Sequence, residues 1–487
     1  MSFATSLSVS TKQDPEVTRL NQRRLALVNW RFGMFIHFSP TTFLDPSQHL
    51  HPDHAPPMQG IDGVFGTRDD VDPRMFHPTL LDCDQWACAA KSAGMTFGVF
   101  TTKHHDGFCN WPSAHSRYKV VEGRCGDVVD SYVKAFRKQG LKVGLYFSIR
   151  DRTDEIVTRG DGHEVDERGL SLILQQLTEL LTQYGPIDLI IFDGWGNDWH
   201  ESPTFLEIPI HRVYEHVHLL QPDCLVLNHS RNRSLGDAIQ IEQRAGMSLP
   251  SGSDWAAIAG DTIQDTWFWR PEYTKAELKS VDWMVNHNLR PLNQRNVTFL
   301  LNCAPNRQGL LDLNVVDRLA EVGAAWVRPP DVTQVPESWE NWPIPSHQIS
   351  ALATDERFAS YQAEQFHLGG SGLQRISAVT STSFTIPSAG VWTVFDLGSE
   401  HLVHRVLVWN GRWLMNDLFD RGEIHLLPAR TPLEEAHPGA WITVGSITEA
   451  PGYPSAYEIQ VNARYLAISH GSSVPVEVGR LEVVVRR

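Results

Sequence analysis

Two carboxylates each end an apolar run that has the character of a buried strand. Asp193 ends the run in DLIIFDG (188–194), and Glu242 lies near the end of AIQIEQ (238–243). Carboxylates are seldom buried without a partner or a function. A pair of carboxyl groups about 5–5.5 Å apart can act as nucleophile and acid/base on a glycosidic bond. Asp193 has the position expected of a nucleophile, and its partner has to be found.

Polar side chains also occur where the other apolar runs end. They are His37, the segment Lys103-His104-His105-Asp106, Tyr146, Ser148, Arg150, Asn228, His229, Arg231 and Asn302. A nucleophilic serine in G-x-S-x-G and a phosphate-binding P-loop are both absent from the sequence. Because His104 and His105 are adjacent, extended backbone would point them to opposite sides, which favours hydrogen bonding over a zinc site. Carboxylates, neutral histidines and aromatic rings suit a hydroxyl-rich, uncharged substrate.

The elements that would position these residues alternate between short strands and longer helices from residue 30 to about 328. Near-continuous apolar strands separated by amphipathic stretches indicate a parallel sheet covered on both faces. Seven strands predict a (β/α)8-like barrel with one strand unrecognised, in which the strand ends form the active-site rim. A doubly wound sheet is the alternative, although no G-x-G-x-x-G follows the first strand. The seven runs are 33–39, 95–102, 142–149, 188–194, 224–230, 238–243 and 297–305.

The composition and the hydrophobic pattern change after residue 328. A Pro-rich stretch, 329–347, reads as a linker between a catalytic domain at 1–328 and a second domain at 348–487. The second domain alternates apolar and polar residues in short runs, which predicts an antiparallel β-sandwich.

Composition narrows the function classes. The chain of 487 residues has 42 Lys and Arg against 57 Asp and Glu, a net charge of −15, which opposes binding to nucleic acid or to an anionic membrane. The first 20 residues contain no apolar signal segment, and the six cysteines form no C-x-x-C pair. We therefore expect a cytoplasmic protein, or a secreted one if a signal peptide has been removed. A homo-oligomer is compatible with the sequence.

The catalytic stretch resembles the α-L-fucosidases of glycoside hydrolase family 29. RFGMFIHFSP (31–40), TTKHHDGFCNWPS (101–113), GLYFS (144–148), IFDGWG (191–196) and NVTFLLNCAPNRQGLL (296–311) are similar to family motifs in the same order. The resemblance implies a retaining mechanism without metal or cofactor and Asp193 as nucleophile. It also implies sugar contacts, for which we expect His37, His104, His105, Trp111, Tyr146, Arg231 and Trp267. Residues 391–411 resemble a discoidin-type, galactose-binding-like sandwich.

The sequence departs from the family at the acid/base. The family's Glu would fall near Ile258 or Ala259, and no Glu is there. The remaining candidates are Glu242, favoured because it ends a strand, then Asp261 and Asp254. A Glu-Trp pair expected in the loop after the first strand is also not evident.

The sequence therefore predicts an exo-acting retaining glycosidase of the α-L-fucosidase type, with an altered sugar or linkage preference as an option. Its substrate would be an oligosaccharide or glycoconjugate. The alternative is a catalytically silent carbohydrate-binding protein on the same fold. A metal-dependent hydrolase at the histidines is a third reading.

Overall fold

The computed structural model describes most of the barrel and the strands that follow it. The described ranges are 15–44, 72–121, 124–157, 165–196, 202–203, 207–229, 236–249 and 253–339, and then 358–360, 364–369, 372–376, 384–386, 392–410, 423–428, 438–446, 454–469 and 476–486.

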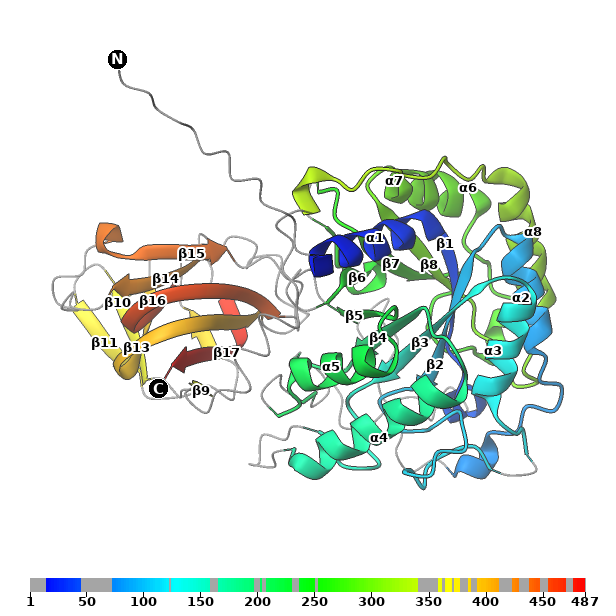
Figure 1. Ribbon diagram of the computed structural model, residues 1–487, viewed down its shortest axis with the longest axis horizontal. Helices are drawn as coiled ribbons and strands as arrows, with labels where there is room; N and C mark the ends of the chain where they lie inside the picture. Colours follow the sequence, from blue (N-terminus) through cyan, green and yellow to red (C-terminus); the bar gives the residue numbers. More distant parts are fainter. Residues whose placement is uncertain are drawn as a thin grey trace, which may run out of the picture.

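Eight parallel strands form a closed barrel in chain order, with β8 pairing back onto β1 (Figure 1). Nearly every strand residue is buried, as expected for a sheet with a filled interior and helices outside. The strands are β1 (Phe32–Ile36), β2 (Phe97–Lys103), β3 (Lys142–Ser148), β4 (Leu189–Asp193), β5 (Leu225–His229), β6 (Ala238–Glu242), β7 (Ala257–Thr262) and β8 (Val297–Asn302). The predicted (β/α)8-like barrel is confirmed.

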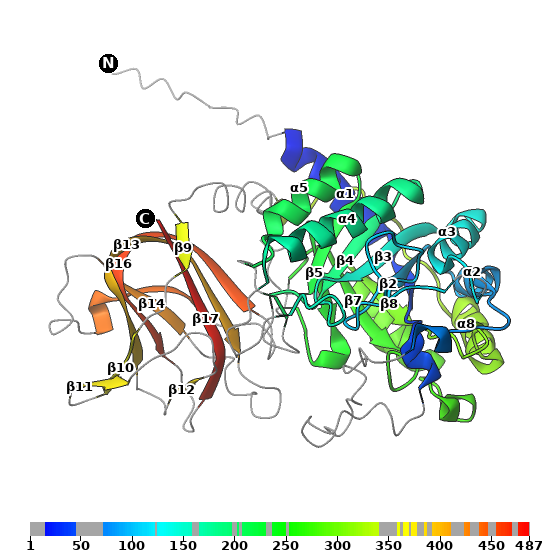
Figure 2. The same ribbon diagram turned by 90° about the horizontal axis from the view of Figure 1, so that it is seen from below.

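Helices surround the barrel, as Figures 1 and 2 show from two directions. Asp82, Asp127 and Asp166 cap the N-termini of α2, α3 and α4 by accepting backbone N–H groups. The helices are α1 (Pro15–Trp30), α2 (Cys83–Ser92), α3 (Val128–Lys138), α4 (Glu167–Gln183), α5 (Ile210–Leu220), α6 (Val281–Met284), α7 (Arg290–Asn293) and α8 (Leu313–Ala325). In the described part of the chain, no helix has the length and apolar character needed to cross a membrane.

The strand that the sequence did not reveal is β7. Three of the six residues in its sequence, AIAGDT, are Ala or Gly and one is Asp, all of which are depleted in strands. Ala257, Ile258 and Ala259 are nonetheless fully buried, between β6 and β8. Strand β7 forms because it pairs with β6 on one side and β8 on the other, which closes the barrel. The local composition does not reveal this pairing.

The end of the barrel opposite the rim is covered by chain from the predicted linker. Arg31 Nη2 donates to the Pro330 carbonyl, and Asn29 exchanges hydrogen bonds with Val332. Trp339 is completely buried, and its indole N–H donates to the Asp254 carbonyl. Residues as far as Trp339 therefore pack on the barrel; 340–347 lie outside the described residues.

The C-terminal strands are antiparallel throughout, which confirms the antiparallel prediction for this region. They hydrogen-bond into a nine-stranded sheet in which the long β13 pairs with β10, β16 and β17. Phe395, Val406 and Leu466 belong to the hydrophobic core of this part. The strands are β9 (Phe358–Ser360), β10 (Glu364–Gly369), β11 (Gly372–Ile376), β12 (Phe384–Ile386), β13 (Trp392–Asn410), β14 (Glu423–Pro428), β15 (Ile442–Ser446), β16 (Pro454–Ser469) and β17 (Val476–Arg486).

Candidate active site

A pocket lies at the C-terminal ends of the barrel strands, where catalytic residues of this fold collect. Strands β1, β3, β4, β5 and β6 and the segments after β1, β2 and β7 contribute its side chains. The lining residues are Phe35, His37, His104, His105, Tyr146, Asp193, His229, Glu242, Trp267 and Phe268. Six of the predicted site residues beyond Asp193 are among them.

Asp193 is held by contacts from three sides. The Tyr146 hydroxyl donates to Oδ2 at 2.6 Å, and the Gly194 backbone N–H donates to Oδ1 at 2.6 Å. His105 Nε2 lies 3.7 Å from Oδ2, and His229 Nδ1 lies 3.6 Å from Oδ1. The carboxylate is therefore fixed in orientation and keeps limited access to solvent, with a side chain 15 % exposed.

His229 connects Asp193 with Glu242. Its Nδ1 lies 3.6 Å from Asp193 Oδ1 and 3.8 Å from Glu242 Oε2. The two carboxylate oxygens are thus no farther apart than the sum of these distances, a range that includes the about 5–5.5 Å of a retaining pair. Burial lowers the pKa of His229, which favours a neutral ring beside the two carboxylates.

His37 has a defined tautomer. The amide nitrogen of Asn302 donates to the Trp267 carbonyl, so Asn302 Oδ1 faces His37 Nδ1 at 2.8 Å. His37 Nδ1 must then carry the proton, which leaves Nε2 as an acceptor. Burial lowers the pKa of His37 to about 3, so the ring is neutral at physiological pH.

The Nδ1 atom of His105 also carries a proton. The Ser148 hydroxyl donates to the Arg150 carbonyl, so its oxygen accepts the hydrogen bond from His105 Nδ1 at 2.7 Å. The other ring nitrogen, Nε2, lies beside Asp193 Oδ2. His104 stacks almost parallel to Tyr146, with ring centroids 5.5 Å apart. The Nε2 acceptor of His37 and the imidazoles of His104 and His105 on the pocket wall suit a ligand that carries hydroxyl groups.

Aromatic rings close the apolar side of the pocket. Trp267 lies 5.0 Å from His37 and 5.9 Å from Phe35, measured between ring centroids. Phe268 packs edge-on against His37 and His104. Flat apolar surface beside hydrogen-bonding groups is the usual arrangement for a sugar ring, which has an apolar face and a hydroxyl rim.

The other acid/base candidates lie elsewhere. Asp261 does not line the pocket; its Oδ1 accepts the Thr262 N–H, and burial raises its pKa while the charges of Lys279 and Arg244 lower it. Asp254 precedes β7 and therefore lies at the opposite end of the barrel, where its carbonyl accepts from Trp339. Of the three candidates, the structure brings only Glu242 together with Asp193.

Two expected sugar contacts need comment. Trp111 is fully buried away from the pocket, where its indole N–H donates to Glu179 Oε2 on α4, so its position corrects that expectation. Trp111 is close to the two histidines in sequence. The chain between them turns towards the outer helices, however, so that Trp111 contacts α4 and not the pocket. Arg231 lies outside the described residues.

The expectation that His104 and His105 diverge was wrong. Strand β2 ends at Lys103, and a turn closed by Gly107 N donating to the His104 carbonyl follows, so both rings line the pocket. His229, Phe35 and Phe268 were missed as site residues. His229 was visible at a strand end, whereas Phe35 and Phe268 have no local signal that distinguishes them from core.

Among the described residues, no group of three or more His, Cys, Asp and Glu side chains could hold a metal ion.

Comparison with known proteins identifies the family of the chain. An α-L-fucosidase family model matches residues 1–329. The chain is 30 % identical to α-L-fucosidase 1 of Arabidopsis thaliana over 329 residues, covering 61 % of this chain and 59 % of that protein. It is 25 % identical to human tissue α-L-fucosidase over 260 residues, covering 51 % and 53 %. The chain thus spans less than two thirds of these relatives.

A solved structure shows the same fold. The α-L-fucosidase AlfC of Lactobacillus casei aligns with a TM-score of 0.50 and 23 % identity, covering 63 % of this chain and 98 % of that one. Because the family model covers most of the chain, including every described residue of the pocket, this protein belongs to the α-L-fucosidase family, glycoside hydrolase family 29.

Proposed function

We propose that this protein is an exo-acting retaining α-L-fucosidase that removes terminal α-L-fucosyl residues from oligosaccharides or glycoconjugates. The observation that carries the proposal is that Asp193 and Glu242 both lie within 3.8 Å of His229 Nδ1, in a pocket of histidines and aromatic rings. The identity of the sugar, L-fucose, is inferred from the family to which the chain belongs. The loop after β1 lacks the Glu-Trp pair that the family resemblance implies, so a narrower linkage preference is compatible with the proposal.

The mechanism proceeds in two steps. Asp193 attacks the anomeric carbon, and the bond from that carbon to the leaving oxygen breaks as Glu242 gives its proton to that oxygen. Glu242, now a carboxylate, then takes a proton from water, whose oxygen displaces Asp193 from the anomeric carbon. The sugar leaves with its original anomeric configuration, and both carboxyl groups return to their starting states.

The pocket supports recognition of a deoxy sugar. The Nε2 atoms of His37 and His105 would hydrogen-bond to sugar hydroxyls, and the indole of Trp267 offers a surface for the apolar side of the ring. Fucose has hydroxyls on one part of its ring and a methyl group on another, which this division of the pocket suits. We expect the site to prefer it over sugars that carry a hydroxymethyl group there.

Azide rescue tests both assignments. With an aryl α-L-fucoside, Asp193→Gly and Glu242→Ala should each lose most of their activity. Azide should then yield β-fucosyl azide with the Asp193 variant and α-fucosyl azide with the Glu242 variant, because azide replaces the nucleophile in one case and water in the other. Asp261→Asn is the matched control and should keep its activity.

Full activity of Asp193→Asn would exclude the nucleophile assignment. Calorimetric binding of L-fucose without hydrolysis of any fucoside would favour the carbohydrate-binding alternative. Loss of activity with a chelator would favour the metal-dependent reading.

A further inference from the structure

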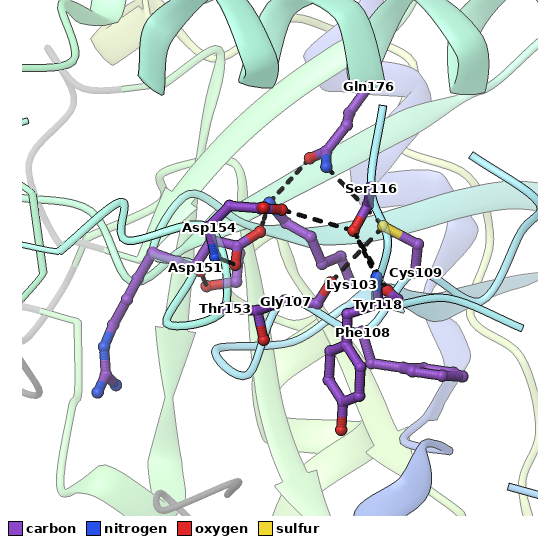
Figure 3. Close-up of polar contacts among 12 residues, drawn as sticks. Lys103, Gly107, Phe108, Cys109, Ser116, Tyr118, Asp151, Thr153, Asp154 and Gln176 are labelled. Atoms are coloured by element: carbon purple, nitrogen blue, oxygen red, sulfur yellow. Dashed lines mark hydrogen bonds and ion pairs between the residues drawn. The ribbon is translucent and has the colours of Figure 1, made fainter. Parts of the chain in front are cut away.

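A buried polar network joins the end of β2 to the loop after β3 and to α4 (Figure 3). Lys103, the last residue of β2, donates from Nζ to Asp151 Oδ2 at 3.0 Å and to Gln176 Oε1 at 2.9 Å. The Lys103 and Asp151 side chains are both completely buried. The mechanism proposed above uses none of these three residues.

The position of Asp151 explains what the network is attached to. Asp151 Oδ1 accepts the Asp154 N–H and also packs against Gly107, whose hypothetical Cβ would lie only 2.1 Å from that oxygen. Gly107 has a φ of +88°, a conformation that favours glycine. The carboxylate therefore occupies the space that the glycine leaves open, and it fixes the turn that follows the histidines.

The loop after β3 holds the histidine loop at neighbouring points as well. Arg152 N donates to the His105 carbonyl at 3.2 Å, and Thr153 Oγ1 donates to the Asp106 carbonyl at 2.7 Å. Residues 151–153 thus hold residues 105–107 through two hydrogen bonds and one close packing contact. The Lys103–Asp151 ion pair joins the start of the histidine loop to this same segment.

An ion pair at this depth has a large cost if either partner is lost. Two buried charges are tolerated only when their geometry and remaining hydrogen bonds are well satisfied, and removing one partner leaves the other uncompensated. Gln176 on α4 and the Asp154 N–H supply those additional bonds. The network consequently has little freedom to shift, and neither has the loop attached to it.

We propose that Lys103, Asp151 and Gln176 are positioning residues that set the orientation of His104 and His105 towards the sugar hydroxyls. The inference rests on the proposed function for the identity of the ligand, but the placement of the two rings can be tested without it. Small displacements of binding groups have large effects on turnover, since a misplacement of about 1 Å can lower the reaction rate about a hundredfold.

The test uses the full chain with the neutral double substitution Lys103→Met/Asp151→Asn, which removes both charges together. Gln176→Leu is a milder second variant. Glu179→Gln is the matched control, because Glu179 lies on the same helix, one turn away, and bonds Trp111 and the Ala114 N–H instead of the histidine loop. Circular dichroism establishes that each variant is folded before the comparison.

The readouts are the KM for an aryl α-L-fucoside, the inhibition constant of L-fucose and the kcat per titrated active site. Partial unfolding lowers the number of active sites and leaves KM unchanged, whereas misplaced histidines weaken binding. We expect KM and the inhibition constant to rise about tenfold in the double variant and severalfold in Gln176→Leu. Glu179→Gln should leave both unchanged.

A readout independent of activity is the imidazole ¹⁵N spectrum of His104 and His105. We expect the His105 Nδ1 signal, which reports its bond to Ser148, to shift in the double variant and to stay in place in the control. A folded double variant with wild-type KM, inhibition constant and ¹⁵N shifts overturns the proposal. If the wild type hydrolyses no fucoside, the proposed function fails, and the ¹⁵N spectra still decide the positioning role.

Discussion

The Tyr146 hydroxyl donates a 2.6 Å hydrogen bond to Oδ2 of Asp193. Tyr146 lies on β3, next to β4, which ends at Asp193, so adjacent barrel strands supply the carboxylate and its donor. The bond orients the carboxylate, while the His229 nitrogen stands beside its other oxygen. The orientation of Asp193 therefore depends on two neighbouring strands in addition to its own.

Tyr146→Phe removes this bond and keeps the ring that stacks on His104. A hydrogen bond to a charged group contributes about 1.5–3 kcal/mol, so we expect kcat/KM to fall roughly tenfold to a hundredfold. Steady-state kinetics on an aryl α-L-fucoside provides the measurement. Unchanged kcat/KM would mean that Asp193 does not need this donor for orientation.

Substitutions of His229 should distinguish its two ring nitrogens. Nδ1 is the atom near both Asp193 and Glu242, and an Asn amide can place a donor near that position. A Gln amide instead resembles Nε2. We expect His229→Asn to retain about tenfold more kcat/KM than His229→Gln, when both are compared at equal folded fraction. The reverse order would show that Nε2 makes the important contact.

Asp106 should make stability depend on pH. Burial, together with the charge of Asp151, raises its pKa to about 7, although the Phe108 N–H and Lys103 act in the opposite direction. Because this value lies above the unfolded pKa of about 3.9, the stabilisation is fully present below about pH 4 and is lost as the pH rises through 7. The total change is on the order of 4 kcal/mol.

The measurement is urea unfolding at pH 5 and pH 8 for the wild type and Asp106→Asn. The Asn side chain keeps an oxygen for the Phe108 N–H but does not titrate. We expect the wild type to lose more free energy of unfolding than the variant between these two pH values. Equal losses in both proteins would rule out Asp106 as the titrating group.

Gly323 in α8 should not tolerate alanine. Replacing glycine inside a helix usually gains up to about 1 kcal/mol, but a Cβ here would lie 1.9 Å from the Ser92 carbonyl oxygen at the end of α2. We expect Gly323→Ala to lower the free energy of unfolding by about 1–3 kcal/mol, the usual cost of overpacking. The neighbouring, exposed Ala324 gives the control, since Ala324→Gly should show only the helix-propensity loss of up to about 1 kcal/mol. A stabilised Gly323→Ala would show that α2 and α8 can separate.

Local sequence determined much of this protein. Apolar strands that alternate with amphipathic helices require a covered parallel sheet, and a polar residue at the end of such a strand must emerge at the rim. Asp193, Glu242, His37 and Tyr146 could therefore be placed before the structure was known. Strand β7 could not, because small residues carry little strand signal by themselves and need the closed barrel to define them.

Only the tertiary structure decided how these residues combine. It brought Glu242, and neither Asp261 nor Asp254, into the pocket with Asp193, because proximity to Asp193 depends on which strand ends meet, and no spacing along the chain records that. It brought His104 and His105 into one pocket, placed His229 beside both carboxylates, and moved Trp111 into the core against Glu179. The sequence determined which side chains reach the rim, and their distances arose from long-range packing and hydrogen bonds, which join residues far apart in the chain.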